Sequence, residues 1–287
     1  MKKLAMFLAG SALAATTAVA GSNFNGPFIG AHIGVGNADM GTSASAFSNA
    51  QAAAAPFIAL NGDGNLISMN GDMSALGVIG GLHAGWDKVF NGKWLLGIEL
   101  TGDLSSASGD FQATGPNARN AANNGFLAGD NIKVDADMDW AIGVNVRAGA
   151  IIHDCLVYLA LGWMGADWEM KTTYTPRQIR VDAAGAPNAA GAVNATFATR
   201  SHKKDKFKSG FRLALGTSMM VNEHLMAGVE AAYTWFGSLS DTRVVSGVRV
   251  DGNTANGRFD NVTVRSKIEP ELLTAKFKLS WKFKRAA

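Results

Sequence analysis

The sequence has little cysteine, little charge and no long apolar run in its mature part. A single cysteine, Cys155, excludes a disulfide framework, and no Cys/His cluster has the spacing of a structural zinc site. Charged residues make up only 17% of the 287 residues. No apolar run in the mature chain reaches the roughly 20 residues that a transmembrane helix needs. The hydrophobic content of 47% is nevertheless too high for a disordered chain.

The first residues, 1–20, have the pattern of a secretory signal peptide. A positive start is followed by an apolar region over 4–15 and by small residues at the two positions that a signal peptidase requires. We therefore expect export, cleavage after Ala20 and one mature domain over 21–287.

The mature chain is almost neutral. Cleavage removes Lys2 and Lys3, so the 26 basic residues become 24 against 23 acidic residues, a net charge of +1. A chain with this balance has no electrostatic basis for binding nucleic acid.

Apolar residues alternate with small or polar ones many times along the mature chain, which is the pattern of β-strands. Near the middle, for example, Trp140, Ile142 and Val144 are separated by small or polar residues. The eight predicted strands are 28–35, 78–86, 94–103, 140–149, 157–163, 211–216, 225–235 and 273–283.

The connections between these strands alternate between long and short. An even number of antiparallel strands with tight turns at one end and long loops at the other is typical of outer-membrane barrels. The sequence therefore predicts an all-β fold, an eight-stranded antiparallel up-and-down transmembrane β-barrel with four long extracellular loops and short periplasmic turns. The expected long loops are 37–75, 105–139, 165–206 and 237–271, and the expected turns are 87–93, 153–154 and 222–223.

The two rows of each strand decide between a membrane barrel and a soluble one. A soluble barrel would need many charges in the row opposite the apolar row, but here that row is mostly Gly and Ala with isolated charges. The apolar rows contain no charge, as a lipid-facing surface requires. Six tryptophans in the apolar rows are expected to form girdles at the two membrane interfaces. They are Trp86, Trp94 and Trp281 near the short turns, and Trp140, Trp163 and Trp235 near the long loops.

Four segments resemble a known family. The sequence 81–87 (GLHAGWD) is similar to that family's second strand and 96–103 (LGIELTGD) to its third. The sequence 228–237 (GVEAAYTWFG) resembles its seventh strand and 279–283 (LSWKF) its closing strand. The family is the small eight-stranded outer-membrane β-barrel proteins of Gram-negative bacteria, of the opacity-protein-like and alphaproteobacterial surface-antigen type.

The resemblance covers essentially the whole mature chain and implies a location in the bacterial outer membrane. It also implies outer-membrane lipid, lipopolysaccharide and the barrel-assembly machinery as partners, with host or envelope ligands at the loops left open. Members include structural, adhesive, haem-binding and weakly pore-forming proteins, so the resemblance does not select one activity. The family usually ends on an aromatic residue, whereas here Phe283 is followed by four more residues.

Charged side chains in the inward rows should meet inside the barrel. Because residues at equal height on neighbouring strands are close, we expect a Glu99–Arg147 pair and a Glu230–Lys278 pair, with Arg212 higher in the lumen. Buried charges must be paired, so these side chains should form a polar plug across the lumen. The predicted members of the plug are His32, His83, Glu99, Arg147, Arg212, Glu230 and Lys278.

Two other interpretations use the same residues. His32, His83 and Glu99 could make a two-histidine, one-carboxylate metal site, but histidines hydrogen-bonded in a polar lumen are the favoured interpretation, and no metal is predicted. Alternatively, Glu99 could exchange partners so that the plug opens as a gate. Eight-stranded barrels are only just wide enough for side chains, so low or no conductance is expected.

No motif points to catalysis. The chain lacks a His-Glu-x-x-His or a Gly-x-Ser-x-Gly motif, and Cys155 beside His153 is interpreted as a free thiol in a tight turn. The basic run Lys203, Lys204, Lys206 and Lys208 is either a solvated loop end or a contact for lipopolysaccharide phosphates.

Two function classes remain. The first is a non-enzymatic structural and surface-exposed protein that acts through its loops, with a lumen closed by the polar plug and no cofactor. The alternative is a narrow porin or gated channel for small solutes, which predicts conductance that rises when Glu99 or Arg147 is replaced by Ala.

Overall fold

The computed structural model describes residues 24–48, 65–114, 126–128, 131–175, 177–180, 195–196, 199–249 and 259–283. The predicted signal peptide, 1–20, and its cleavage site lie outside these residues. Within them there is no helix long and apolar enough to cross a membrane.

The described residues are almost entirely β-strand. Most strands exceed 20 residues, which is far longer than the average strand of a globular protein. In chain order they are β1 (Gly26–Ser48), β2 (Asn65–Phe90), β3 (Trp94–Thr114), β4 (Phe126–Ala128), β5 (Asn131–Ile152), β6 (Cys155–Thr175), β7 (Arg177–Arg180), β8 (Ala195–Thr196), β9 (Arg200–Met220), β10 (Leu225–Phe236), β11 (Leu239–Arg249) and β12 (Phe259–Lys282).

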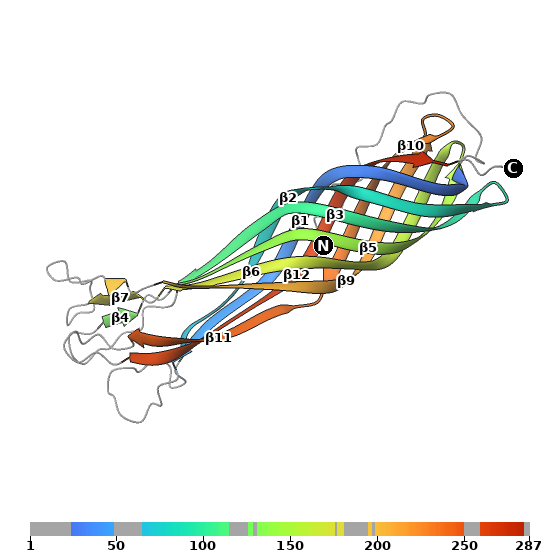
Figure 1. The fold of residues 1–287 in the computed structure, drawn as a ribbon. Helices are drawn as coiled ribbons and strands as arrows, with labels where there is room; N and C mark the ends of the chain where they lie inside the picture. Colours follow the sequence, from blue (N-terminus) through green and yellow to red (C-terminus); the bar gives the residue numbers. More distant parts are fainter. Residues whose placement is uncertain are drawn as a thin grey trace.

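The main sheet closes on itself. Its order is β1-β2-β3-β5-β6-β9-β10-β12-β11, every pairing is antiparallel, and β1 also pairs with β12, where Ile29 lies opposite Trp281. Figure 1 shows the resulting long, tilted cylinder, with β4, β7 and the far end of β11 at the end away from the C-terminus. Over the length of β10, closure leaves no edge strand around the ring, which is the condition for crossing a membrane with strands.

β10 and β11 together occupy one position in the wall. β10 pairs with the lower part of β12, up to Trp235 opposite Glu271, and β11 pairs with the upper part from Leu239 opposite Ile268. The ring of the main sheet therefore has eight wall positions in the described residues, and the predicted eight-stranded up-and-down barrel is confirmed. Small strands β4, β7 and β8 form a separate sheet.

The turns at one end of the barrel are tight, as predicted. Asn91 and Gly92 have φ angles of 51° and 65°, and the Lys93 amide donates to the Phe90 carbonyl at 3.0 Å. Two successive positive φ values define a type I′ turn, whose twist matches that of the strands it joins. His153, with φ 57°, starts the second short turn.

The expected long loops are wrong in their extent. β1 continues to Ser48 and β2 starts at Asn65, so most of 37–75 is strand rather than loop. The same holds for parts of 105–139, 165–206 and 237–271. These stretches are rich in Asn, Ser, Asp and Ala, and they form strands in which small apolar residues alternate with polar ones.

The tryptophan girdles divide the barrel into two parts. Trp94 of the inner girdle lies opposite Ala150, and Trp140 of the outer girdle is ten residues from Ala150 on the same strand. Likewise, Trp281 lies opposite Leu225, and Trp235 is ten residues from Leu225 on the same strand. At about 3.3 Å per residue and a tilt near 40°, ten residues span about 25 Å, the height of an outer-membrane barrel's apolar band. The wall between the girdles is called the membrane half, and the wall beyond Trp140, Trp163 and Trp235 the outer half.

The two halves have opposite polarity. In the membrane half of β1, Ile29 and Ile33 are exposed on the outer surface while His32 is buried inside. In the outer half of the same strand, Ala38 and Met40 are buried inside and the outward row is polar. The membrane half is thus apolar outside and polar inside, and the outer half is built like a soluble protein.

The interior of the outer half is a continuous apolar core. Trp168 is its largest side chain; it is fully buried and packs edge-on against Phe236 with the ring centroids 5.7 Å apart. Methionines fill much of the remaining space, as suits an irregular cavity between long strands. They are Met40, Met73, Met138, Met164 and Met170.

The outward row of the outer half carries a line of carboxylates. Asp137 pairs across strands with Glu169, and Glu169 pairs with Asp205. Partial burial raises the pKa of the Asp137 carboxyl, and the charges of Glu169, Asp135 and Asp139 raise this pKa further. Like charges directly opposite each other on neighbouring strands are destabilising.

We predict that Asp137→Asn stabilises the protein at neutral pH. A carboxyl with a raised folded-state pKa favours the fold below the ordinary pKa of about 3.9, and this contribution is lost as pH rises through the raised value. The substitution should therefore raise the unfolding temperature in detergent micelles at pH 7 and leave it nearly unchanged at about pH 3. Asp110→Asn, at an exposed carboxylate 3.8 Å from Lys133, is the control. Equal effects of both substitutions at pH 7 would contradict the assignment.

Candidate functional site

The lumen of the membrane half is lined with buried charged side chains. Each points inward because it falls in the row opposite the lipid-facing row of its strand. All have exposed fractions of 6% or less. The acidic and basic residues are Asp87, Glu99, Asp103, Arg147, Arg212, Glu230, Lys276, Lys278 and Lys282, joined by His32 and His83.

Arg147, from β5, is the anchor of the lower part of the lumen. Its Nη2 donates to both carboxylate oxygens of Asp87 at 2.6 Å, and its Nη1 donates to Glu99 at 3.0 Å. The guanidinium carbon lies 4.7 Å from the ring centre of Phe28 and 5.0 Å from that of Tyr158. Two carboxylates and two aromatic faces therefore compensate the desolvation of one buried cation.

The network continues across the lumen through β12. Lys278 Nζ lies 2.6 Å from Glu99 and 3.3 Å from Glu230, so it joins carboxylates from β3 and β10. Arg212 donates to Glu230 at 2.6 Å, and the Tyr158 hydroxyl donates to the same carboxylate at 3.0 Å. A connected line of alternating charges thus runs between opposite walls of the barrel.

The two histidines form a second branch of the network. His32 Nε2 lies 2.5 Å from Asp103, which also accepts from Lys276 at 2.6 Å. The Nδ1 atoms of His32 and His83 are 3.2 Å apart, and His83 Nε2 lies 2.7 Å from the Ser280 hydroxyl.

The two pairs expected from the sequence, Glu99–Arg147 and Glu230–Lys278, are both present in the structure, and all seven predicted residues line one lumen.

Sequence reasoning missed four further charged members of the network. Asp87 had been assigned to a turn, but β2 continues to Phe90. The other three could have been found from the sequence, because each lies an even number of residues from a predicted member of the plug on the same strand. Residues at an even spacing on a strand point to the same face. The missed members are Asp87, Asp103, Lys276 and Lys282.

The arrangement does not favour the metal interpretation. His32 and His83 contact each other, but Glu99 turns away to Arg147 and Lys278. In the part of the chain that the structure describes, no group of three or more His, Cys, Asp or Glu side chains could hold a metal ion.

The six predicted tryptophans all lie on the outer surface, with exposed fractions between 39% and 61%. At the outer girdle, Phe207 packs between Trp140 and Trp163, with ring centroids 5.7 and 6.2 Å away. This aromatic cluster places wide amphipathic rings at one height, as an interface requires.

The basic run lies on the outer half of β9, and its lysines have different partners. Lys204 Nζ lies 3.0 Å from Asp241 and donates to the Ser240 carbonyl at 3.0 Å. Lys208 donates to the Ser238 carbonyl at 2.5 Å, in the connection between β10 and β11. Lys203 forms an ion pair with Glu169 on the outer face. Lys206 is exposed.

A closed barrel with an apolar belt, two aromatic girdles and a polar lumen defines the class of outer-membrane β-barrel proteins. A family model described as outer membrane protein beta-barrel domain matches residues 5–265. The chain belongs to this family, whose location is the bacterial outer membrane.

A comparison with solved structures found several matches at low identity. The outer membrane protein OprG of Pseudomonas aeruginosa is 14% identical, with 93% of this chain and 100% of that chain covered and a TM-score of 0.42. Ail, the attachment invasion locus protein of Yersinia pestis, is 10% identical over 88% and 99% of the two chains, with a TM-score of 0.23. The outer membrane protease OmpT of Escherichia coli is 11% identical over 89% and 97%, with a TM-score of 0.25. No curated protein matches the sequence.

We predict that Arg147→Ala destabilises the barrel strongly. The substitution removes the cation that joins the buried carboxylates of Asp87 and Glu99 and leaves them only Lys282 and Lys278. Breaking a buried ion pair typically costs about 3–5 kcal/mol. The free energy of unfolding, measured by denaturant titration in lipid vesicles, should fall by that amount.

Arg265→Ala is the matched control. Arg265 is exposed and lies over the Phe47 ring at 5.5 Å, a contact worth about 1 kcal/mol or less. If Arg147→Ala cost no more than Arg265→Ala, the network would not be the main support of the lumen.

Proposed function

We propose that the protein is a non-enzymatic outer-membrane barrel whose lumen is closed by the polar plug and whose role is structural and surface-exposed. The observation that carries this proposal is the line of ion pairs from Asp87 through Arg147, Glu99, Lys278 and Glu230 to Arg212. An eight-stranded barrel is only just wide enough for its own side chains, so this line fills the width that an ion would need.

The apolar core of the outer half supports the same proposal independently. It stands above the plug and contains Trp168, Met138 and Met164, each with an exposed fraction of 1% or less. An ion that passed the plug would next meet a dry region without partners for its lost hydration shell. Two barriers of opposite chemistry therefore act in series.

A non-enzymatic role is supported by the pairing of the lumen carboxylates. Asp87, Glu99, Asp103 and Glu230 each lie 2.6 Å from a basic nitrogen. Carboxylates held this way are stabilised as anions and are poor general acids.

The surface role is assigned to the outer half and to the connections at its end. From Trp163 to Thr175, twelve residues of β6 extend the wall about 30 Å beyond the outer girdle. The connections 49–64, 115–125, 181–194 and 250–258 lie outside the described residues. We propose that they contact host or envelope ligands, and that Lys206 contacts lipopolysaccharide phosphates.

Planar-bilayer recordings test the closed lumen. We expect no conductance above background from the wild type, nor from Glu99→Ala or Arg147→Ala alone, because the apolar core remains above the plug. Arg147→Ala combined with Trp168→Ala should conduct, since it opens both barriers. Each sample is first shown to contain folded barrel by its heat-dependent shift on gels.

A steady wild-type conductance would overturn the proposal. Conductance that appears in either single variant, but not in Arg265→Ala, would favour the alternative of a narrow gated channel in which Glu99 exchanges partners.

A further inference from the structure

The wall of the outer half is open between β9 and β11. Pairing between β9 and β10 ends at Phe236 opposite Gly210, and the Gly237 amide makes one more bond to the Ser209 carbonyl at 3.2 Å. Beyond this point β11 pairs with β12 but not with β9. Among the described residues, side chains alone bridge this gap: Lys204 and His202 reach Asp241 on β11, and Lys208 reaches the Ser238 carbonyl just before it. Lysines are the usual protection of an unpaired strand edge.

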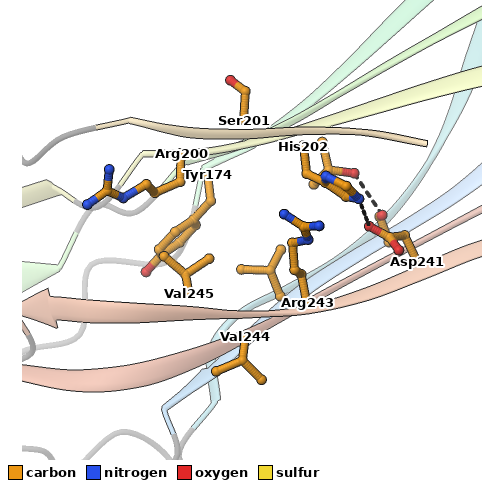
Figure 2. Close-up of a pocket in the computed structure, with 11 residues that line it drawn as sticks. Tyr174, Arg200, Ser201, His202, Asp241, Arg243, Val244 and Val245 are labelled. Carbon is orange, nitrogen blue, oxygen red and sulfur yellow. Dashed lines mark hydrogen bonds and ion pairs between the residues drawn. The ribbon is translucent and has the colours of Figure 1, made fainter.

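A cavity of about 260 Å³ lies in this opening. Its walls come from β6, β9, β11 and β12, and Figure 2 shows Arg243 rising from β11 toward His202 on β9, with Tyr174 beside Arg200. Val245 and Val264 give it an apolar side, while Thr172 and Ser266 contribute hydroxyls that hydrogen-bond each other at 2.8 Å. The volume suits a ligand of about the size of one sugar phosphate, below the usual range for drug-sized ligands.

The charge of the cavity is positive. Its one lining carboxylate, Asp241, is already neutralised by Lys204 at 3.0 Å and also lies 3.8 Å from His202. Arg200 and Arg243 have no ion-pair or hydrogen-bond partner among the described residues. Two guanidinium groups beside an apolar wall therefore retain their donors for an anion from outside the protein.

The chemistry of these donors matches a phosphate group. Arginine presents its N–H donors in a planar fork that binds two oxygens of a phosphate at once. The cavity opens at the level of Tyr174, eleven residues beyond Trp163, or about 25–30 Å above the outer girdle. Interfacial phosphates of the bilayer lie within about 6–8 Å of the hydrocarbon, so they do not reach this height.

We propose that this cavity is a binding site for the phosphate group of a small phosphorylated sugar, with Arg200 and Arg243 as its principal ligands and His202 beside them. Such a group has two sources, the saccharide part of the lipopolysaccharide that surrounds the barrel, and solutes of the medium. The site stands independently of whether the lumen conducts.

Calorimetric titration of the full chain in phospholipid nanodiscs tests the proposal. Glucose 6-phosphate and inorganic phosphate should bind saturably, glucose should not bind, and the affinity should fall as NaCl is raised because the site is partly exposed. Arg200→Gln and Arg243→Gln should each weaken glucose 6-phosphate binding about tenfold or more. Arg243→Lys should recover only part of the loss, because an ammonium group cannot bind two oxygens in the same plane.

Arg265→Gln is the matched control, since it removes the same charge from an exposed position on neighbouring β12. Absence of saturable binding, or an equal loss in Arg265→Gln, would overturn the site. Adding lipopolysaccharide with a phosphorylated core to the nanodiscs identifies the source. If it blocks glucose 6-phosphate binding in the wild type, the natural ligand is the surrounding saccharide; if it does not, the ligand is a solute.

Discussion

Every backbone polar group inside a hydrocarbon layer must find a partner within the protein, and the pairing of β1 with β12 supplies the last of these partners. Closure of the barrel also determines which side chains fill the lumen. Because side chains alternate strictly across a strand, each lipid-facing residue implies an inward neighbour, and eight wall positions enclose just enough space for those neighbours to touch. The ion pairs of the lumen follow from this geometry.

The same alternation serves two environments along one strand. On β6, Leu159 and Leu161 face outward in the membrane half, whereas Glu169 and Lys171 occupy the same row in the outer half. Inside, polar residues give way to Met164, Trp168 and Met170 over the same distance. On β6 and β9 the pairing continues without a shift through the girdle, whereas β3 and β5 have irregularities between Leu104 and Ala107 and between Met138 and Trp140. The strands nevertheless run on through the girdle, so it marks a change of solvent rather than a change of fold.

The sequence predicted the eight strands of the membrane half, which row of each strand faces the lipid and which the lumen, and two of the ion pairs. All of these depend only on the alternation of side chains between the two faces of a strand. It was insufficient where contacts depend on the width and stagger of the closed barrel. Glu99 on β3 meets Lys278 on β12 across the lumen, and these strands are not neighbours in the sheet. The outer half was mistaken for loops because its Ala, Ser and Asp residues have low strand propensity and form a ladder only through their tertiary packing. The sequence predicted the end of a strand before Gly237, but not that β11 would resume beside β12 and leave β9 unpaired.

Depth-resolved spin labelling of the outward row of β6 tests whether the polarity of the wall reverses at the outer girdle. With Cys155 replaced by Ser, single cysteines at Leu159, Leu161, Glu169 and Lys171 would carry the label in lipid vesicles. We expect labels at 159 and 161 to collide mainly with oxygen dissolved in the lipid, and labels at 169 and 171 to collide mainly with a water-soluble nickel complex. Water exposure at 159 and 161, or lipid exposure at 169 and 171, would contradict a barrel whose polarity reverses at the outer girdle.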